Sequence, residues 1–369
     1  MKITEIKTIP LEMPLTHPFP GSTYSITKRC TLITEVNTDE GIAGVTFLGD
    51  NKYFQDAVIR IIREDFAPIL IGEDPLCTER CWQKMFQVTL KQGDRARVAE
   101  AMGAVDTSLW DLLGKACNQP VHKLLGGYTD RLHPIIITGY YEAGKGPKDL
   151  AEEVKHYKEQ GFAGAKVKVG GLSPLDDAKR VEAVREAVGA DFIIGCDANQ
   201  GWTRHEAVQF GLAVRDLGIT WFEEPVHWYD EIQGMKYVRQ HTGLSVSAGQ
   251  SEFSYRGCRE LVEGEAVDIL NFDTSCGGGV TEWMRVAKMA ETFQVRMAHH
   301  EEPLISMHLM GAIKHGLYPE YFSEVRDPMT PRLVKNLPKI ANGWVSIPTA
   351  PGFGIELDED FIRRYKVDL

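Results

Sequence analysis

Ionisable and polar side chains recur at one kind of position in this chain, the end of a short apolar segment. The segment GAKVKV places Lys166 and Lys168 on one face of a strand, because successive strand residues point to opposite faces. Six further apolar segments end in the same way, with Asp197 and Asn199, Glu223 and Glu224, Gln250 and Glu252, Asp273, His299 and His300, and Glu324. Lysines and carboxylates that converge alter each other's pKa values, and such groups perform proton transfer.

Each of these residues alone has an ordinary structural interpretation. A lysine in a strand usually belongs to a solvated face, and the acids of WFEEP can be exposed at a strand end. A single histidine is more often a hydrogen-bonded structural residue than a catalyst. Charges placed at random would not fall at corresponding ends of seven consecutive segments. We therefore interpret the whole set as one active site.

The segments that end in these residues alternate with amphipathic helices from about residue 132 onward. Val181, Val184 and Val188 mark one helix, and Thr203 with Glu206 forms a capping box at the start of another. Eight strand-like segments separated by helices predict an α/β fold, a (β/α)8-type barrel with parallel strands. In such a barrel the carboxyl ends of the strands meet at one face, which would bring the residues above together.

Residues 1–128 have a different pattern and predict an α+β capping domain. The segment TLITEVNTDEGIAGVTF predicts a β-hairpin with its turn at residues 38–41, and residues 97–116 have helical spacing. Residues 129–341 form the predicted barrel domain. We expect the tail, about residues 342–369, to return to the capping domain and complete it.

The composition of the 369 residues, 43% hydrophobic and 25% charged, is typical of a folded globular protein. A net charge of −11 disfavours a nucleic-acid-binding protein, which is usually basic. The seven cysteines lie scattered without CxxC pairs, and no signal peptide or membrane-length apolar run is found. We therefore expect a cytoplasmic protein with neither a nucleic-acid nor a membrane partner.

The spacing of KVK, CDAN, WFEEP, AGQSE, NFD…GGGVT and AHHE resembles the enolase superfamily, specifically its mandelate racemase-like branch, over the whole chain. The resemblance implies a modified (β/α)7β barrel and one Mg²⁺ ion held by Asp197, Glu223 and a third ligand. The family usually has a glutamate at the third position, whereas Gln250 stands here. Gln250 would bind through its neutral amide oxygen, and Glu252, two residues further on, is the alternative.

The resemblance also implies a mechanism that begins with removal of a proton next to a carboxylate. Lys168 would be the base on one face of the substrate, and Lys166 would lower the pKa of Lys168 by like-charge repulsion. His300 would be the acid or base on the opposite face, with Asp273 holding its tautomer. His299 is the alternative to His300, because adjacent strand residues face opposite ways.

Further residues are expected to bind the substrate. By resemblance, Glu324 would hydrogen-bond the substrate carboxylate, and Asn199 would make a polar contact. The stretch LTHPFPGSTYS, residues 15–25, would close over the barrel mouth and bring His17, Phe19 and Tyr24 to the substrate. The alternative is a merely exposed loop rich in proline and glycine.

These expectations together predict a lyase, an acid-sugar dehydratase that uses Mg²⁺ and forms a 2-keto-3-deoxy product through an enediolate. A racemase or epimerase of a hydroxy acid with the same Lys168–His300 pair is the alternative, because both reactions begin with loss of the α-proton. A catalytically silent ligand-binding barrel is an alternative of another class, for which Gln250 is the argument. We expect a small-molecule carboxylate as substrate and, by resemblance, a homo-oligomer between a dimer and an octamer.

Overall fold

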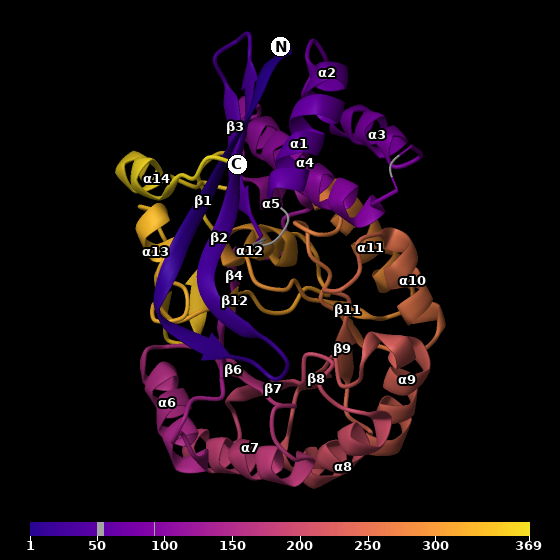
Figure 1. Cartoon of the computed structure of the whole chain (residues 1–369), viewed down its shortest axis with the longest axis vertical. Helices are drawn as coiled ribbons and strands as arrows, with labels where there is room; N and C mark the ends of the chain where they lie inside the picture. Colours follow the sequence, from indigo (N-terminus) through magenta and orange to yellow (C-terminus); the bar gives the residue numbers. More distant parts are fainter. Residues whose placement is uncertain (50–54, 92) are drawn as a thin grey trace.

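The computed structural model describes residues 1–49, 55–91 and 93–369 and shows a cap above a barrel (Figure 1). The cap contains an antiparallel sheet of order β1-β2-β3, formed by β1 (Ile3–Pro20), β2 (Ser25–Thr38) and β3 (Ala43–Leu48). Strands β2 and β3 are the predicted hairpin. The helices of this part are α1 (Gln55–Arg60), α2 (Ala67–Leu70), α3 (Thr78–Val88), α4 (Arg95–Ala116) and α5 (Val121–Leu125), with a π-helical stretch at Ile61–Phe66 between α1 and α2.

Eight parallel strands form the curled sheet of the barrel, in the order β11-β10-β9-β8-β7-β6-β5-β12. They are β5 (Ile135–Thr138), β6 (Gly164–Lys168), β7 (Ile193–Asp197), β8 (Trp221–Glu223), β9 (Val246–Ala248), β10 (Ile269–Leu270), β11 (Arg296–Met297) and β12 (Glu320–Tyr321). The helices between them are α6 (Pro147–Glu159), α7 (Pro174–Val188), α8 (Arg204–Val214), α9 (Glu231–Thr242), α10 (Tyr255–Glu263), α11 (Gly279–Thr292) and α12 (Pro303–Ala312).

The two outer strands of the curled sheet are joined through the main chain. The amide of Met297 in β11 donates to the carbonyl of His315 at 2.9 Å, and the Met297 carbonyl accepts from the amide of Leu317 at 2.9 Å. Residues 315–317 lead directly into β12. Seven strand–helix units followed by an eighth strand make this a (β/α)7β barrel, which confirms the predicted fold class.

The last part of the chain contacts both the barrel and the cap. A small sheet of order β13-β14-β4 consists of β13 (Ile340–Ala341), β14 (Trp344–Ser346) and β4 (Arg131–Leu132), and two more helices are α13 (Thr330–Leu333) and α14 (Glu359–Tyr365). Beyond α14, the amide of Val367 donates to the carbonyl of Pro10 in β1 at 3.0 Å. The domain boundaries at residues 128 and 341 stay a prediction.

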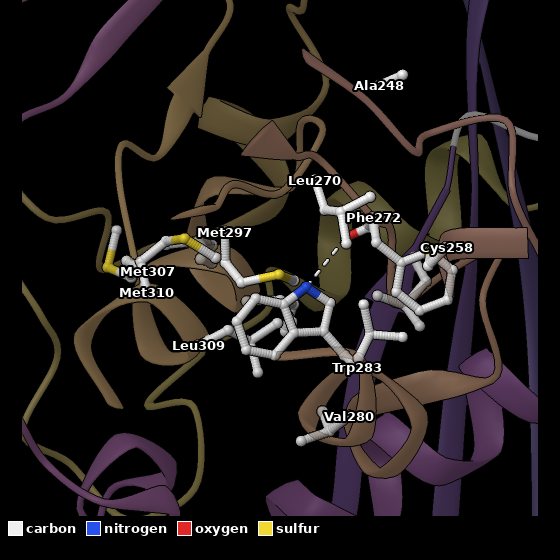
Figure 2. Packing of buried hydrophobic residues seen from close by; sticks show 14 of the residues in the cluster. Ala248, Cys258, Leu270, Phe272, Val280, Trp283, Met297, Met307, Leu309 and Met310 are labelled. Carbon is white, nitrogen blue, oxygen red and sulfur yellow. Dashed lines mark hydrogen bonds between the residues drawn. The ribbon is translucent and has the colours of Figure 1, made fainter. Parts of the chain in front are cut away.

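The apolar core continues from the barrel strands to their covering helices. Trp283 of α11 lies against Leu270, Phe272 and Met297, and its indole N–H donates to the Phe272 carbonyl at 3.0 Å (Figure 2). Because the buried indole has a hydrogen-bond partner, its apolar surface stabilises the fold without an unsatisfied donor, by about 2–3 kcal/mol. In the described ranges, no helix combines the length and the apolar character needed to cross a membrane.

Specific polar contacts hold the cap on the barrel. Asp106 of α4 is buried and accepts from both the amide and the hydroxyl of Thr281 at 2.8 Å, at the beginning of α11. Burial raises the pKa of Asp106 to about 7. At the far side of the cap, the β1–β2 hairpin reaches down toward the ends of β6 and β7 (Figure 1), where the Ser22 hydroxyl donates to the Ala198 carbonyl at 3.0 Å. The cap is thereby fixed over the face to which the barrel strands point.

Candidate active site

The two lysines of β6 lie inside the barrel and face carboxylates on the neighbouring strands. The sheet register sets Lys168 beside Asp197, and Asp197 beside Glu223. The Nζ atom of Lys168 lies 2.5 Å from Asp197 Oδ2 and 2.9 Å from Asn199 Oδ1. The Nζ atom of Lys166 lies 2.7 Å from Glu223 Oε1 and 3.8 Å from Asp197 Oδ2. Two buried ammonium groups are tolerated on this strand because carboxylates offset their charge.

Glu320 of β12 is a third carboxylate on Lys166, and the sequence reasoning missed it. Its Oε1 lies 2.6 Å from Lys166 Nζ, and the residue is 4% exposed. Glu324 instead lies exposed in a turn, because β12 ends at Tyr321 and the chain leaves the sheet. The expectation that the eighth strand ends with Glu324 is therefore wrong, and its contact with a substrate carboxylate stays a prediction.

Burial and ion pairing act in opposite directions on these groups. Burial alone would lower the pKa of Lys168, but Asp197 raises it well above its ordinary value. Burial raises the pKa of Glu223 to about 8, although Lys166 acts to lower it. Burial would also raise the pKa of Asp197, yet the two ammonium groups hold it below its ordinary value. The expected repulsion between the two lysines is present, since Lys168 acts to lower the pKa of Lys166, but it does not set the pKa of Lys168, because the carboxylate at 2.5 Å dominates.

A histidine–aspartate pair follows β10 and β11. His300 Nδ1 lies 3.0 Å from Asp273 Oδ2, and 23% of the His300 side chain is exposed. Burial would lower the pKa of His300, but Asp273 and then Glu301 raise it to about 10. His299 is fully buried, and its Nε2 accepts from the Thr274 amide at 3.0 Å. His300 is thus partly exposed and His299 is not, which agrees with the prediction of His300 over His299 as the residue that faces the substrate.

The two candidates for a third metal ligand lie in different surroundings. The Gln250 amide nitrogen donates to Glu224 Oε2 at 2.9 Å, and its oxygen accepts from the Asn271 side chain at 3.2 Å. Glu252 packs on α10, where its carboxylate occupies the place that a Cβ atom on Gly257 would take. Glu252 also lines a cavity between α3 and α10 rather than the lysine cluster.

The oxygen donors present fit Mg²⁺, which prefers carboxylates and neutral oxygen ligands. Asp197 and Glu223 are buried on neighbouring strands, and Gln250 follows the next strand of the sheet with an amide oxygen. In the part of the chain that the structure describes, no three His, Cys, Asp or Glu side chains converge as a metal site. A set of two carboxylates and one amide is compatible with that finding.

Trp221 orients Glu223 from within the barrel. Its indole N–H donates to Glu223 Oε2 at 2.9 Å, so Oε1 remains on the side of Lys166. The indole ring passes over Gly195 of β7, where a Cβ atom would lie 2.2 Å from the ring. Glycine is therefore required at this position so that the tryptophan can hold the carboxylate.

Backbone strain gathers at the same strand ends. Five residues other than glycine with left-handed φ values between 37° and 63° follow β7, β8 and β11, namely Asn199, Gln200, Glu224, Glu301 and Glu302. Each such residue costs about 1–3 kcal/mol, and this strain is typical of active sites. No pattern of residue types in the sequence indicates it.

The tip of the β1–β2 hairpin brings some of its predicted residues to the site. The Tyr24 hydroxyl donates to Asn199 Oδ1 at 3.3 Å, and its ring lies 5.9 Å from Lys168 Nζ. Phe19 is fully buried against Tyr140 with ring centroids 4.5 Å apart, so it supports the site from behind. His17 is exposed on β1. Contacts of these residues with a substrate stay a prediction.

Tyr140, two residues beyond β5, is a further site residue that the sequence reasoning missed. Its ring lies 6.0 Å from Lys168 Nζ, and the residue is 3% exposed. Burial raises the pKa of its phenol, which therefore stays protonated and can donate a hydrogen bond. The apolar run PIIITGY indicated Tyr140 only because it predicts the first barrel strand. The search for site residues rested on charged groups, and a tyrosine is neutral.

The fold is a (β/α)7β barrel beneath an α+β cap. Lysines, carboxylates and a histidine–aspartate pair lie at the ends of its strands, where enzymes built on such barrels have their active site. Residues 3–126 match the family described as mandelate racemase / muconate lactonizing enzyme, N-terminal domain, and residues 149–361 match the enolase C-terminal domain-like family. The chain therefore belongs to the enolase superfamily, in its mandelate racemase-like branch.

Several known proteins resemble the chain over most of its length. An arabinonate dehydratase of Saccharolobus solfataricus is 30% identical over 90% of both chains, and an N-succinyl-L-Arg/Lys racemase of Bacillus cereus is 30% identical over 100% of this chain and 98% of its own. A mandelate racemase/muconate lactonizing enzyme from a marine actinobacterium, solved in complex with magnesium, is 43% identical with a TM-score of 0.93, covering 100% of this chain and 99% of its own. The curated relatives are thus enzymes, both dehydratases and racemases.

Proposed function

We propose that this protein is a Mg²⁺-dependent dehydratase of an acid sugar. The observation that supports the proposal best is the pairing of Lys168, beside Asp197, with a His300–Asp273 pair at the ends of other strands of the same barrel. A base and an acid held separately are what removal of an α-proton and loss of a β-hydroxyl require. The arabinonate dehydratase among the relatives supports the same reaction class.

In this proposal, the α-proton passes to the Lys168 amine and the electron pair of the C–H bond forms an enediolate. His300 then donates a proton to the departing β-hydroxyl, which leaves as water, and the enol product rearranges to a 2-keto-3-deoxy acid. Asp273 raises the pKa of His300 to about 10, so His300 stays protonated at neutral pH and can act as the acid. Lys166 holds Glu223 and Glu320 together and adds positive charge beside the developing anion.

Asp197, Glu223 and Gln250 would hold Mg²⁺. The bound ion would supply Lewis-acid charge for the enediolate, and it would also engage the Asp197 carboxylate that otherwise raises the pKa of Lys168. Before it can accept a proton, Lys168 must be neutral. Its hydrogen bonds to Asp197 and Asn199 identify the partners whose rearrangement would allow that neutral state.

Racemisation with the same pair is the second candidate, favoured by the racemase among the relatives. The test uses a library of acid sugars with Mg²⁺ in D₂O, and it measures 2-keto product together with exchange of the α-proton. Dehydration predicts product, whereas racemisation predicts exchange and inversion without product. A catalytically silent barrel predicts neither signal, and that result would contradict the proposed function. The homo-oligomer also stays a prediction, to be checked by sedimentation.

Two variants connect this reaction with its proposed residues. Lys168→Ala should lose both exchange and product by at least about 100-fold, because the general base is removed. His300→Asn should keep some exchange but lose product, because the enediolate forms while its leaving group lacks an acid. If the two phenotypes are exchanged, His300 is the base and the substrate has the opposite α-configuration. Full turnover by well-folded Lys168→Ala would refute the assignment.

A further inference from the structure

A cavity of about 310 Å³ lies between the cap sheet and the β12 side of the barrel. It shares a wall with the candidate active site, because Glu301 lines it and also lies 3.5 Å from His300 Nε2. Its volume is in the range of small-molecule pockets, about 300–1,000 Å³.

The charged lining of this cavity is predominantly acidic. Among the described residues that line it, four are acids and one is a cation, and the acids are Glu301, Glu302, Glu324 and Asp327. The cation, Arg29, lies over the Phe322 ring at 4.2 Å and donates its Nε to the Arg326 carbonyl at 3.0 Å. Side chains such as Phe47 and Ile305 supply apolar walls. The hydroxyl groups of Thr31, Tyr321 and Thr330 in the lining are neutral and can donate or accept.

The pKa of Glu302 indicates how unfavourable this wall of the cavity is for a negative charge. Burial first, and then the charges of Asp273 and Glu301, raise its pKa to about 8. Its Oε1 accepts from the Gly49 amide at 2.6 Å, and even this hydrogen bond does not restore an ordinary pKa. A second carboxylate brought into the cavity by a ligand would meet the same burial and the same neighbouring charges.

We infer that the acid sugar is an aldonate, a monocarboxylate whose far end carries hydroxyl groups, and not an aldarate with a carboxylate at both ends. Hydroxyl groups can donate to the carboxylates of Glu301, Glu324 and Asp327, whereas a second carboxylate cannot donate to them and is repelled. This inference rests on the proposed function, since it places the substrate carboxylate at the lysine cluster and the far end of the substrate past Glu301 in this cavity.

The test compares each aldonate with the aldarate of the same configuration, over all available five- and six-carbon configurations. The two members of a pair differ only in whether the last carbon is a hydroxymethyl group or a carboxylate. Like-charge repulsion in a partly buried site predicts a kcat/KM roughly 100-fold higher for the aldonate of the accepted configuration. An aldarate used equally well or better would overturn the inference while the proposed function stands. If no member of any pair shows product or α-proton exchange, the proposed function and this inference both fail.

A double variant tests whether the cavity wall causes the preference. Glu324→Gln with Asp327→Asn removes two charges and keeps the side-chain oxygen of residue 327 that accepts from the Met329 and Thr330 amides. The aldonate preference, the ratio of the two kcat/KM values, should narrow by about tenfold, with an unchanged Tm and circular dichroism spectrum as the measure of correct folding. The matched control, Asp216→Asn with Glu359→Gln, neutralises two exposed acids outside the lining of the cavity and should leave the ratio unchanged. An unchanged ratio in the first variant would refute the proposed cause.

Discussion

Replacing Asp273 with asparagine should move the pH range in which His300 can act as an acid. The asparagine oxygen can still accept from His300 Nδ1, now 3.0 Å from Asp273 Oδ2, so the ring keeps its orientation and loses its partner's charge. The pKa of about 10 lies well above the ordinary value of 6.5. At 1.36 kcal/mol per pKa unit this corresponds to roughly 5 kcal/mol, which we reduce to about 3 because 23% of the side chain is exposed to solvent.

The loss of that interaction should return the pKa of His300 to near its ordinary value of 6.5, because burial and Lys166 then offset the charge of Glu301, which remains. At pH 8 the protonated fraction would fall from nearly all molecules to about 3%, so formation of the 2-keto product should fall about 30-fold. Near pH 6 the variant should approach the wild-type rate. Exchange of the α-proton, which needs Lys168 and no acid, should persist over the whole range.

The assay is kcat/KM for product formation between pH 5.5 and 10, with exchange measured in parallel. The pairing should also affect stability: the pKa of His300 is higher in the folded state, so its contribution is complete below about pH 6.5 and is lost as the pH rises through about 10. The Tm deficit of the Asp273→Asn variant should therefore be larger at pH 6 than at pH 10. A variant that forms product at pH 8 at the wild-type rate would refute the role of His300 as the acid.

Three further perturbations test other parts of the site. Gln250→Ala should weaken Mg²⁺ binding, measured by calorimetry, by about tenfold or more. Glu252→Gln should leave Mg²⁺ binding unchanged, and the reverse result would make Glu252 the third metal ligand. Tyr24→Phe removes a hydroxyl that contacts the site and should raise KM several-fold without lowering Tm, and an unchanged KM would make the hairpin contact purely structural. Gly195→Ala should destabilise the protein by about 1–3 kcal/mol in thermal unfolding, because its Cβ atom would meet the Trp221 ring, and a stable variant would contradict the packing argument.

The strand ends could be predicted from the sequence because parallel strands present their ends at one face. That rule correctly brought Lys166, Lys168 and Asp197 together. It failed for Glu324, since the alternation of side chains cannot say where a strand of two residues stops, and Glu320 lies on Lys166 instead. The direction of a pKa shift could not be predicted either, because it depends on which charge is nearest.

The capping box of Thr203 with Glu206 was predictable for a different reason. Both of its hydrogen bonds are made within four residues, so the local sequence determines them. The role of Glu252 was not predictable in this way, because its packing on Gly257 depends on the path of the loop after β9. The positive φ values after β7, β8 and β11 likewise arise from tertiary structure that holds each strained residue in place.

The β1–β2 hairpin carries a consequence for how substrate preference can change over evolutionary time. The residues assigned to proton transfer belong to the barrel, whereas Ser22 and Tyr24 reach the strand ends from a hairpin of the cap. Substitutions near the hairpin tip are therefore expected to alter which molecule is bound without disturbing the barrel residues to which proton transfer is assigned. Related proteins can therefore evolve different substrate preferences while the residues of proton transfer stay the same. Exchanging residues 15–25 between relatives would be an experimental way to transfer such a preference.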